Sequence, residues 1–450
     1  MRSLIAAARE LPDWNNPEGE DKKRSFMKNK ETAGMKIKKK KWLAAGALLA
    51  LCIGLLGGCG GKKTGAAEYV KDLSEFKAQE NVRIYALGEA THGNAEFQQL
   101  KREVLEQLVA EGVRGFVLEA DFGGCRLVNR YVTEDIGDAK TAVDYLMFRL
   151  YRTNEMEELL QWIHDYNQQA EEKDQIRFYG MDIQSSVYTK QLVEEFYDLA
   201  DESAAAGIRE KLEACFISEG TVSPEQLQDG IAYAQELIQD MDEKRETYIE
   251  RTDEETFAFA RQSLVCLVKH AGLLSAAVYA EYRDEAMYEN VTWILEREEE
   301  LHQSKIMISA HNGHVTKVVS SGYINLGSRI YDEYQEAYYV IGTDYDRTSC
   351  NLPDSKGNRA NHSFASGDPI AKELPKTPGK RYLLQFSDVP QGTVLYDTIH
   401  EKMKMGSLGE QYSLLIKLIP QCHRIERVPV DLYDAMIFVK KASPTNPWPR

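Results

Sequence analysis

The chain has 450 residues and a formal charge of −16, and 43% of its residues are hydrophobic. This length and composition are typical of a globular protein with a sizeable core, and they exclude a disordered or fibrous chain. Residues 1–58 hold 12 Lys+Arg and 6 Asp+Glu, so residues 59–450 carry 43 basic against 65 acidic side chains, a net charge of −22. Such an acidic body repels phosphate backbones, which argues against a nucleic-acid partner.

The amino-terminal segment is typical of a targeting signal. Lysines at 36 and 38–41 precede an apolar run at 42–56, which is too short for a comfortable transmembrane helix. The run ends in Leu56-Gly57-Gly58-Cys59, which resembles the lipobox of bacterial lipoproteins. We therefore expect residues 35–58 to be a signal peptide, Cys59 to be lipidated, and residues 59–75 to be a flexible tether. An uncleaved signal anchor is the alternative.

This interpretation also gives a location. A lipidated Cys59 anchors the protein on the bacterial cell surface or another extracytoplasmic membrane face, with the lipid as its only membrane contact. Residues 1–34 are polar, lack a fold pattern and precede Met35, itself a suitable start. We interpret them as a non-structural or mis-assigned upstream segment, so the folded domain is expected over residues 76–450.

Strand-like apolar runs alternate with helical patterns through the folded part of the chain. The first run, at 82–87, precedes a helical pattern at 95–109, and further runs follow at 115–118, 176–179 and 305–309. Strands that alternate with helices imply a parallel sheet covered on both faces. We predict an α/β fold with three α/β/α layers, a mainly parallel central sheet and a large helical insertion.

The longer connections have their own patterns. Residues 139–170 predict two amphipathic helices, and residues 189–303 predict an almost wholly helical insertion, broken at Gly207, at 220–224 and around Gly272. Strand-like runs return at 337–341, 381–386 and 435–439. The segment Asn351–Thr377 is rich in Gly, Pro, Ser and charge, so we expect a loop near the mouth of the site.

Polar side chains follow four of the predicted strands. Because the carboxyl ends of parallel strands meet at one edge of a sheet, these groups can converge although they span more than half the chain. A single charge at a strand end is usually solvated or caps a helix, and such a capping role stays open for Glu89 and Asp182. The side chains concerned are Glu89 and His92, Glu119 and Asp121, Asp182, and His311 and His314.

The carboxylates and histidines at these strand ends are suited to activating a water molecule. A histidine paired with a carboxylate is more basic and can take a proton from water, while a second imidazole stabilises the oxyanion or protonates the leaving alcohol. Gly-x-Ser-x-Gly, Gly-x-x-x-x-Gly-Lys, Gly-x-Gly-x-x-Gly and His-Glu-x-x-His motifs are absent, which disfavours a serine acyl-enzyme, a nucleotide site and a zincin. One divalent metal ion held by Glu89, His92 and His311 is the alternative route to activated water.

Six ordered segments resemble the erythromycin esterase family, and the resemblance runs from about residue 80 to the end. It implies an α/β/α core with a helical insertion and hydrolysis of a macrolide lactone by histidine-activated water, without a cofactor. The roles it implies are His92 as general base, Glu89 and Glu119 as its carboxylate partners, and His311 as a second essential imidazole. The matching segments are Gly88–Gly93, Glu119–Asp121, Met147–Asn167, Tyr179–Asp182, Tyr282–Asn290 and Ala310–Val315.

Several residues are expected to support this chemistry. Where the family usually has an arginine in the helix after the first motif, this chain has Lys101 followed by Arg102, so the cationic role stays open between them. We expect a lipid-anchored carboxylic ester hydrolase, with a small ester or a macrolide lactone as its partner and macrolide resistance as its role. A metal-dependent hydrolase and a solute-binding lipoprotein are the alternatives. The remaining supporting residues are Asp121, Asp182, Arg283 and His314.

Overall fold

The computed structural model describes residues 63–216 and 222–449. The upstream segment 1–34, the signal peptide at 35–58 and the lipidated Cys59 lie outside the described residues and stay predictions. None of the helices within the described ranges is long and apolar enough to cross a bilayer.

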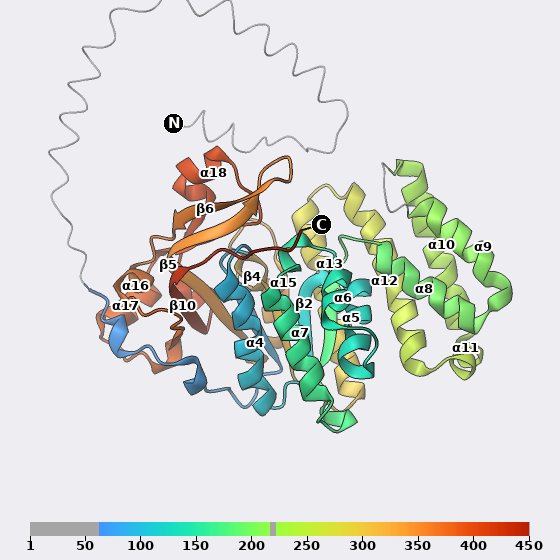
Figure 1. The fold of residues 1–450 in the computed structure, drawn as a ribbon, viewed down its shortest axis with the longest axis horizontal. Coiled ribbons are helices and arrows are strands. Elements are labelled where there is room, and N and C mark those ends of the chain that lie inside the picture. Colours follow the sequence, from blue (N-terminus) through green and yellow to red (C-terminus); the bar gives the residue numbers. More distant parts are fainter. Residues whose placement is uncertain (1–62, 217–221, 450) are drawn as a thin grey trace, which may run out of the picture. The chain divides into compact units, whose positions relative to one another are not determined.

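An eight-stranded sheet forms the centre of the fold (Figure 1). Its order is β3-β2-β4-β1-β5-β10-β7, with β6 paired to β5; neighbours from β3 to β10 are parallel, and β7 and β6 are antiparallel to their partners. A separate hairpin joins β8 (Met403–Gly406) to β9 (Arg424–Arg427). The main-sheet strands are β1 Ile84–Glu89, β2 Gly115–Asp121, β3 Arg177–Asp182, β4 Ile306–His311, β5 Tyr338–Pro353, β6 Arg359–Ala365, β7 Tyr382–Gln385 and β10 Ala435–Ala442.

Helices cover both faces of this sheet because alternate strand residues point to opposite sides. Tyr85 and Leu87 of β1 join a core with one set of helices, and Ile84 and Ala86 join a second core with another set. Every residue of β1 is buried, as expected for a parallel strand between two layers. This confirms the predicted α/β fold. The first set is α4 Ala95–Ala110, α5 Phe122–Glu134, α6 Ala139–Tyr145 and α7 Asn154–Asn167, and the second is α13 Tyr279–Glu300, α15 Leu326–Tyr334, α16 Pro369–Glu373 and α17 Val394–His400.

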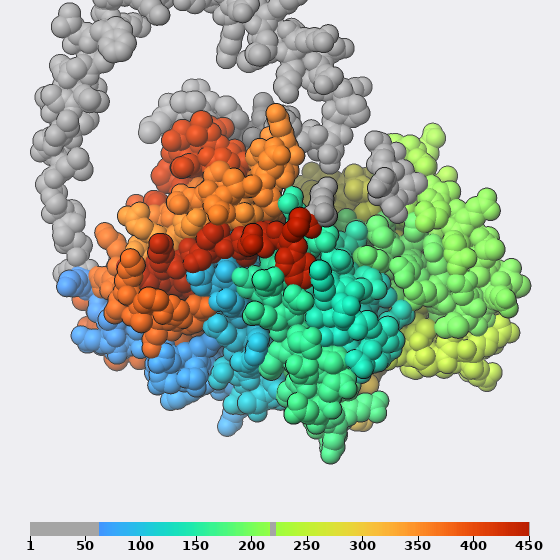
Figure 2. Space-filling view, in the orientation of Figure 1, coloured from blue at the N-terminus to red at the C-terminus, as the bar shows by residue number. Residues whose placement is uncertain are grey.

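The expected insertion is a group of helices with its own apolar core beside the sheet layers (Figures 1 and 2). The predicted break at Gly207 is wrong, because this residue lies inside a helix, whereas a break does lie close to Gly272, at residues 276–278. At Gly272 a Cβ would lie 2.1 Å from the Tyr282 hydroxyl, so glycine serves a close approach there rather than a helix end. The helices are α8 Val187–Ala200, α9 Glu202–Cys215, α10 Pro224–Glu243, α11 Arg245–Arg251 and α12 Glu254–Ser275.

The segment Asn351–Thr377 is not the loop that we expected. It contains the end of β5, all of β6 and α16, and β5 and β6 form a hairpin that extends from the Arg347–Ala365 pair to the Pro353–Arg359 pair. The misleading signal was polarity, because β6 is largely solvent-accessible and therefore carries polar side chains.

We expected a flexible tether at residues 59–75, but its carboxyl-terminal part belongs to the folded unit. Thr64 donates backbone and hydroxyl hydrogen bonds to Glu373, and Lys71 pairs through its backbone with Leu383 of β7. Ala66 and Leu73 are buried, and short 3₁₀ turns occupy Ala66–Glu68 and Leu73–Glu75. Residues 64–75 therefore belong to the folded unit.

Candidate active site

The turn that follows β1 is fixed by close backbone contacts. A Cβ on Gly88 would lie 2.2 Å from Asn312 Oδ1, so only glycine lets α14 (Asn312–Val315) pack against this strand. A Cβ on Gly93 would lie 2.6 Å from the Asn351 carbonyl oxygen, and the Asn351 amide donates to the Gly93 carbonyl at 2.9 Å. These contacts set the position of His92 between the two glycines.

Glu89 is held beside His92 as a buried carboxylate. It is 1% exposed, and it accepts a charge-assisted hydrogen bond from Lys101 Nζ, which also donates to Gln98 Oε1 at 3.0 Å. Burial opposes the charge of Glu89, but Lys101 and His92 outweigh it and hold its pKa below the usual value. Glu89 is therefore an anion at neutral pH.

His92 stands between Glu89 and an open cavity. Its Nδ1 lies 3.6 Å from Glu89 Oε2, so the opposite edge of the ring carries Nε2, and the residue lines the cavity. Burial disfavours the charged ring, but Glu89, Glu119 and Glu410 together raise the pKa of His92 above 6.5. The ring is a stronger base than a free histidine.

Glu119 and Asp182 meet at Arg283, a residue of α13. Arg283 Nη2 donates to Glu119 Oε1 at 2.7 Å and to Asp182 Oδ2 at 2.6 Å, and Arg283 Nε donates to Asp182 Oδ1 at 3.1 Å. Glu119 Oε2 accepts from the His311 backbone amide at 2.8 Å. Burial opposes the Glu119 charge, but His314 and Arg283 hold its pKa well below the usual value. This network ties the ends of β2, β3 and β4 to the helical layer.

His314 is the cationic imidazole of the site. Its Nδ1 lies 2.7 Å from Asp284 Oδ1, and its Nε2 lies 3.3 Å from Glu119 Oε1. Burial and the Arg283 guanidinium, 3.2 Å from Nε2, oppose the charge, but the two carboxylates outweigh them and raise the pKa of His314 to about 9. His314 neutralises buried carboxylates.

His311 has the opposite character. Burial, together with the charges of His92 and His314, lowers the pKa of His311 to about 3, so its ring is neutral. Its Nδ1 accepts from the Gly313 amide at 3.1 Å, which places the ring proton on Nε2. Nε2 is buried without a hydrogen-bond partner, and the ring centroids of His311 and His92 are 5.2 Å apart. His311 thus offers an unused N–H donor beside His92.

These groups line a cavity of about 360 Å³ at the carboxyl edge of the sheet. Its lining includes His92, Glu119, Arg283, His311 and His314, together with apolar and neutral side chains and one further carboxylate. Tyr151 in the wall donates its hydroxyl to the Glu119 carbonyl oxygen at 3.0 Å. The other lining residues are Phe148, Leu150, Gln184, Gly409 and Glu410.

Two of the expected supporting residues lie elsewhere. Lys101 faces Glu89, whereas Arg102 points outward to Glu106 at 2.7 Å, because consecutive helix residues differ by about 100° in direction. Asp121 does not line the cavity; it is fully buried and caps α5 by accepting from the Gly124 amide at 2.8 Å. Its burial raises its pKa to about 7, against the opposing Gly124 hydrogen bond.

Sequence reasoning gave no role to four residues that complete the site. Asp284 lies in the matching segment Tyr282–Asn290 and Tyr151 in the matching segment Met147–Asn167, so the resemblance was the signal that could have found both. Gln98 lies one helical turn from Lys101, but Glu410 comes from a loop that no local pattern connects to the strand ends.

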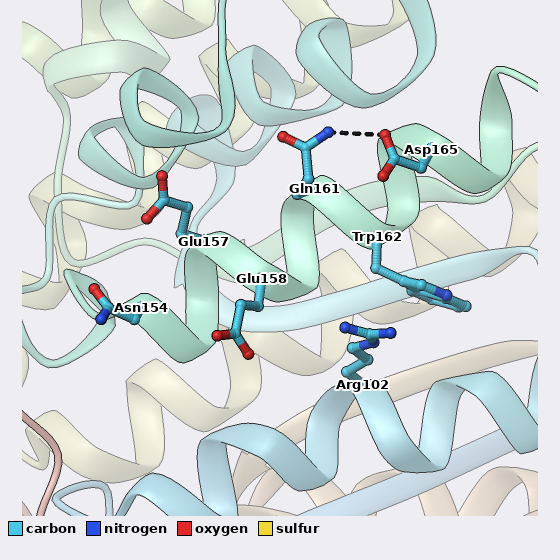
Figure 3. A pocket seen from close by; sticks show the side chains of 7 residues that line it. All are labelled: Arg102, Asn154, Glu157, Glu158, Gln161, Trp162 and Asp165. Carbon is cyan, nitrogen blue, oxygen red and sulfur yellow. Dashed lines mark hydrogen bonds between the residues drawn. The ribbon is translucent and has the colours of Figure 1, made fainter.

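A larger cavity, of about 500 Å³, lies away from this site on the outer surface between α4 and α7 (Figure 3). Arg102 faces Trp162 there, and Gln161 donates to Asp165 at 2.8 Å. The lining is otherwise carboxylates and amides of a single helix, Asn154, Glu157 and Glu158. It lacks the buried, paired imidazoles of the strand-edge cavity.

The proposed metal ligands fit a metal poorly. Within residues 63–216 and 222–449 no group of three or more His, Cys, Asp or Glu side chains is arranged to hold a metal ion. Lys101 already donates to Glu89, and a divalent cation at Glu89 would lie beside that ammonium group. The Nδ1 atom of His311 is occupied by the Gly313 amide.

Fold and site together define an α/β protein with a polar, imidazole-rich cavity at the carboxyl edge of its sheet. The family model described as Erythromycin esterase matches residues 108–442. The chain belongs to the erythromycin esterase family, and this membership supports an esterase-like hydrolase with a small-molecule substrate. The match includes Glu119, Arg283 and His311 and begins after His92.

Three solved structures share the fold. A protein from Bacillus cereus has 22% identity and a TM-score of 0.71, over 86% of this chain and 98% of that chain. A succinoglycan biosynthesis protein has 18% identity and a TM-score of 0.69, over 86% and 97%. A mutant of the erythromycin esterase EreC in its open conformation has 15% identity and a TM-score of 0.56, over 83% and 93%.

Proposed function

We propose that the protein hydrolyses a carboxylic ester by water that His92 activates. One observation carries the proposal: His92, with a raised pKa, and the neutral His311, whose Nε2–H has no hydrogen-bond partner, line the same cavity. The first group can take a proton from water, and the second can donate a hydrogen bond to an oxyanion.

The reaction follows from these two positions. The Glu89 carboxylate, 3.6 Å from His92 Nδ1, favours the ring proton on Nδ1, so Nε2 takes a proton from water as the water oxygen bonds to the ester carbonyl carbon. The carbonyl oxygen becomes an oxyanion that accepts from His311 Nε2–H. When the carbon–oxygen ester bond breaks, the imidazolium of His92 gives its proton to the leaving alkoxide, so that acid and alcohol are the products.

The charges around the cavity support a base at His92. Lys101, Arg283 and His314 carry three positive charges, against four negative charges on Glu89, Glu119, Asp182 and Asp284. This excess of negative charge, to which Glu410 in the lining adds, favours the imidazolium that forms on His92 during the reaction. The low pKa of His311 supports its role as a neutral hydrogen-bond donor rather than as an acid.

Macrolide lactones are the first substrates to test. Pockets for drug-sized ligands have volumes of roughly 300–1,000 Å³, and this cavity is at the lower end of that range. It accommodates the ester group and its neighbouring atoms, while a larger substrate extends beyond the mouth. Macrolide resistance is the corresponding biological role.

Turnover by purified residues 63–450, a single compact unit, tests the reaction. We expect 4-nitrophenyl acetate and erythromycin to be hydrolysed, and His92→Ala and His311→Ala to abolish the reaction. His400→Ala is the matched control, because His400 is an exposed residue of α17. Unchanged turnover in His92→Ala would refute the proposal.

A chelator separates the two routes to activated water. Activity that persists in excess EDTA supports the metal-free route, whereas loss in EDTA and recovery with a divalent ion supports the metal-dependent one. Tight ligand binding without turnover, insensitive to His92→Ala, supports the solute-binding alternative. For the proposed lipoprotein anchor, the mass of membrane-fraction protein is the test, and an unmodified Cys59 would contradict it.

A further inference from the structure

Exposed apolar side chains are concentrated around the mouth of the catalytic cavity. The described chain has 15 large apolar residues with high exposure, and ten of them lie in the segments that supply the cavity lining or directly follow it. A soluble surface normally scatters such residues singly, so this concentration marks a contact surface. We call the ten residues the apolar rim: Met147, Val278, Tyr279, Val318, Val319, Ile324, Leu414, Leu415, Leu418 and Ile419.

Contacts place two parts of the rim beside the cavity. Met147 precedes the lining residue Phe148, and its sulfur accepts from Ser185 at 3.2 Å. The Tyr279 hydroxyl accepts from Gln184, another lining residue, at 2.9 Å. These two residues therefore lie directly beside residues of the cavity lining, Phe148 and Gln184.

The part of the apolar rim that protrudes most is a short helix. The short helix α18 (Leu414–Leu418) follows Glu410 and rests on the carboxyl end of β5 and on β6 through the inward Ile416 (Figure 1). Its other apolar side chains point away, and Leu414, Leu415 and Leu418 are 62–67% exposed. They project outward rather than line a hollow, which is the form of an element that inserts into an interface.

Local charge favours an anionic interface. Residues 401–427 carry five Lys or Arg and three Glu, a net charge of +2, although residues 59–450 carry −22. Lys417 lies within α18 itself, between Leu415 and Leu418. Basic and apolar side chains together are the combination that binds anionic lipid surfaces, while the acidic remainder of the body is repelled from them.

We propose that the apolar rim docks on an anionic lipid surface and that the substrate is a lipid ester drawn from it. This inference rests on the proposed ester hydrolysis. The small polar cavity takes the ester group, and the long acyl chain leaves the mouth across the rim, where α18 contacts the bilayer.

Vesicles test the docking step. Residues 63–450 should sediment with phosphatidylglycerol vesicles and less with phosphatidylcholine vesicles. Leu414→Ser/Leu415→Ser/Leu418→Ser should weaken partitioning by up to about 1,000-fold, since full burial of each of the three leucines is worth about tenfold. The matched control is Ile136→Ser/Leu199→Ser/Leu301→Ser, whose residues are 45–64% exposed and lie outside the rim. Equal partitioning of the two triple variants would overturn the proposal.

Turnover tests the substrate class. 4-Nitrophenyl palmitate in phosphatidylglycerol vesicles should be hydrolysed at least tenfold more slowly by the α18 triple variant, with turnover of soluble 4-nitrophenyl acetate unchanged in both triple variants. Hydrolysis of acetate or soluble erythromycin without hydrolysis of the vesicle ester would overturn the lipid substrate but leave ester hydrolysis standing. Failure to hydrolyse any ester would instead refute the proposed function.

Discussion

Replacement of Glu89 by glutamine separates the electrostatic role of this residue from its structural one. Two unit charges 3.6 Å apart interact by about 4–5 kcal/mol at an effective dielectric constant of about 20, and the Lys101 ammonium offsets part of this effect on His92. We therefore expect the His92 pKa to fall in Glu89→Gln, because the carboxylate that raises it is gone. Because the neutral ring is the base, kcat/KM rises with pH through the pKa of His92, and this rise should move to lower pH.

The same replacement leaves Lys101 as a buried, unpaired cation, which costs about 3–5 kcal/mol of unfolding free energy. Glu89→Gln/Lys101→Met removes the charge and should restore most of that stability. It should not restore activity, because loss of a carboxylate that orients a catalytic histidine lowers kcat by roughly 10²–10⁴-fold.

The assays are the pH dependence of kcat/KM for 4-nitrophenyl acetate and urea unfolding of all three proteins. An acidic limb in Glu89→Gln that coincides with that of the unaltered protein would refute the pairing of Glu89 with His92. A double variant as unstable as the single one would refute the pairing of Glu89 with Lys101.

Three further predictions concern Arg283 and His314, which contact Glu119, and Arg102, which does not line the site. Arg283→Met should lower the unfolding free energy by about 3–5 kcal/mol and abolish turnover, since it leaves Glu119 and Asp182 buried without their cation; unchanged urea unfolding would contradict this. The His314 pKa of about 9 stabilises the fold fully below pH ~6.5, and this contribution, at most about 3 kcal/mol, is lost as pH rises toward 9. Urea unfolding should show a smaller loss over that range in His314→Gln. Arg102→Met should change stability by less than about 0.5 kcal/mol and leave turnover intact, in contrast to Lys101→Met; an inactive Arg102→Met would return the cationic role to that residue.

Local sequence patterns were sufficient to predict an element where the physical cause of that element lies in neighbouring residues. The strand runs ending near Glu89, Glu119, Asp182 and His311 were located within a few residues, because a buried parallel strand needs a continuous apolar run. Polarity misled us at 351–377, where the accessible hairpin strand β6 has the composition of a loop. Glycine misled us at Gly207, which lies inside α9 rather than at a helix break.

The alternatives that the sequence left open depended on where side chains point and on which groups lie within contact distance of them. Lys101 and Arg102 are adjacent in the chain, and only the packing of α4 on the sheet turns the first toward Glu89 and the second toward solvent. Likewise, Asp121 and Asp182 both follow strands, yet one caps a helix and the other binds Arg283.

The sequence by itself determined the alternating α/β architecture, the strand ends that carry His92 and His311, and the resemblance to the erythromycin esterase family. The tertiary structure decided the ionisation of each imidazole: burial beside cations keeps His311 neutral, while carboxylates around His92 and His314 make these rings more basic. A side-chain pKa depends on charges within a few ångströms, and here those charges come from strands and helices up to about 200 residues apart in the chain.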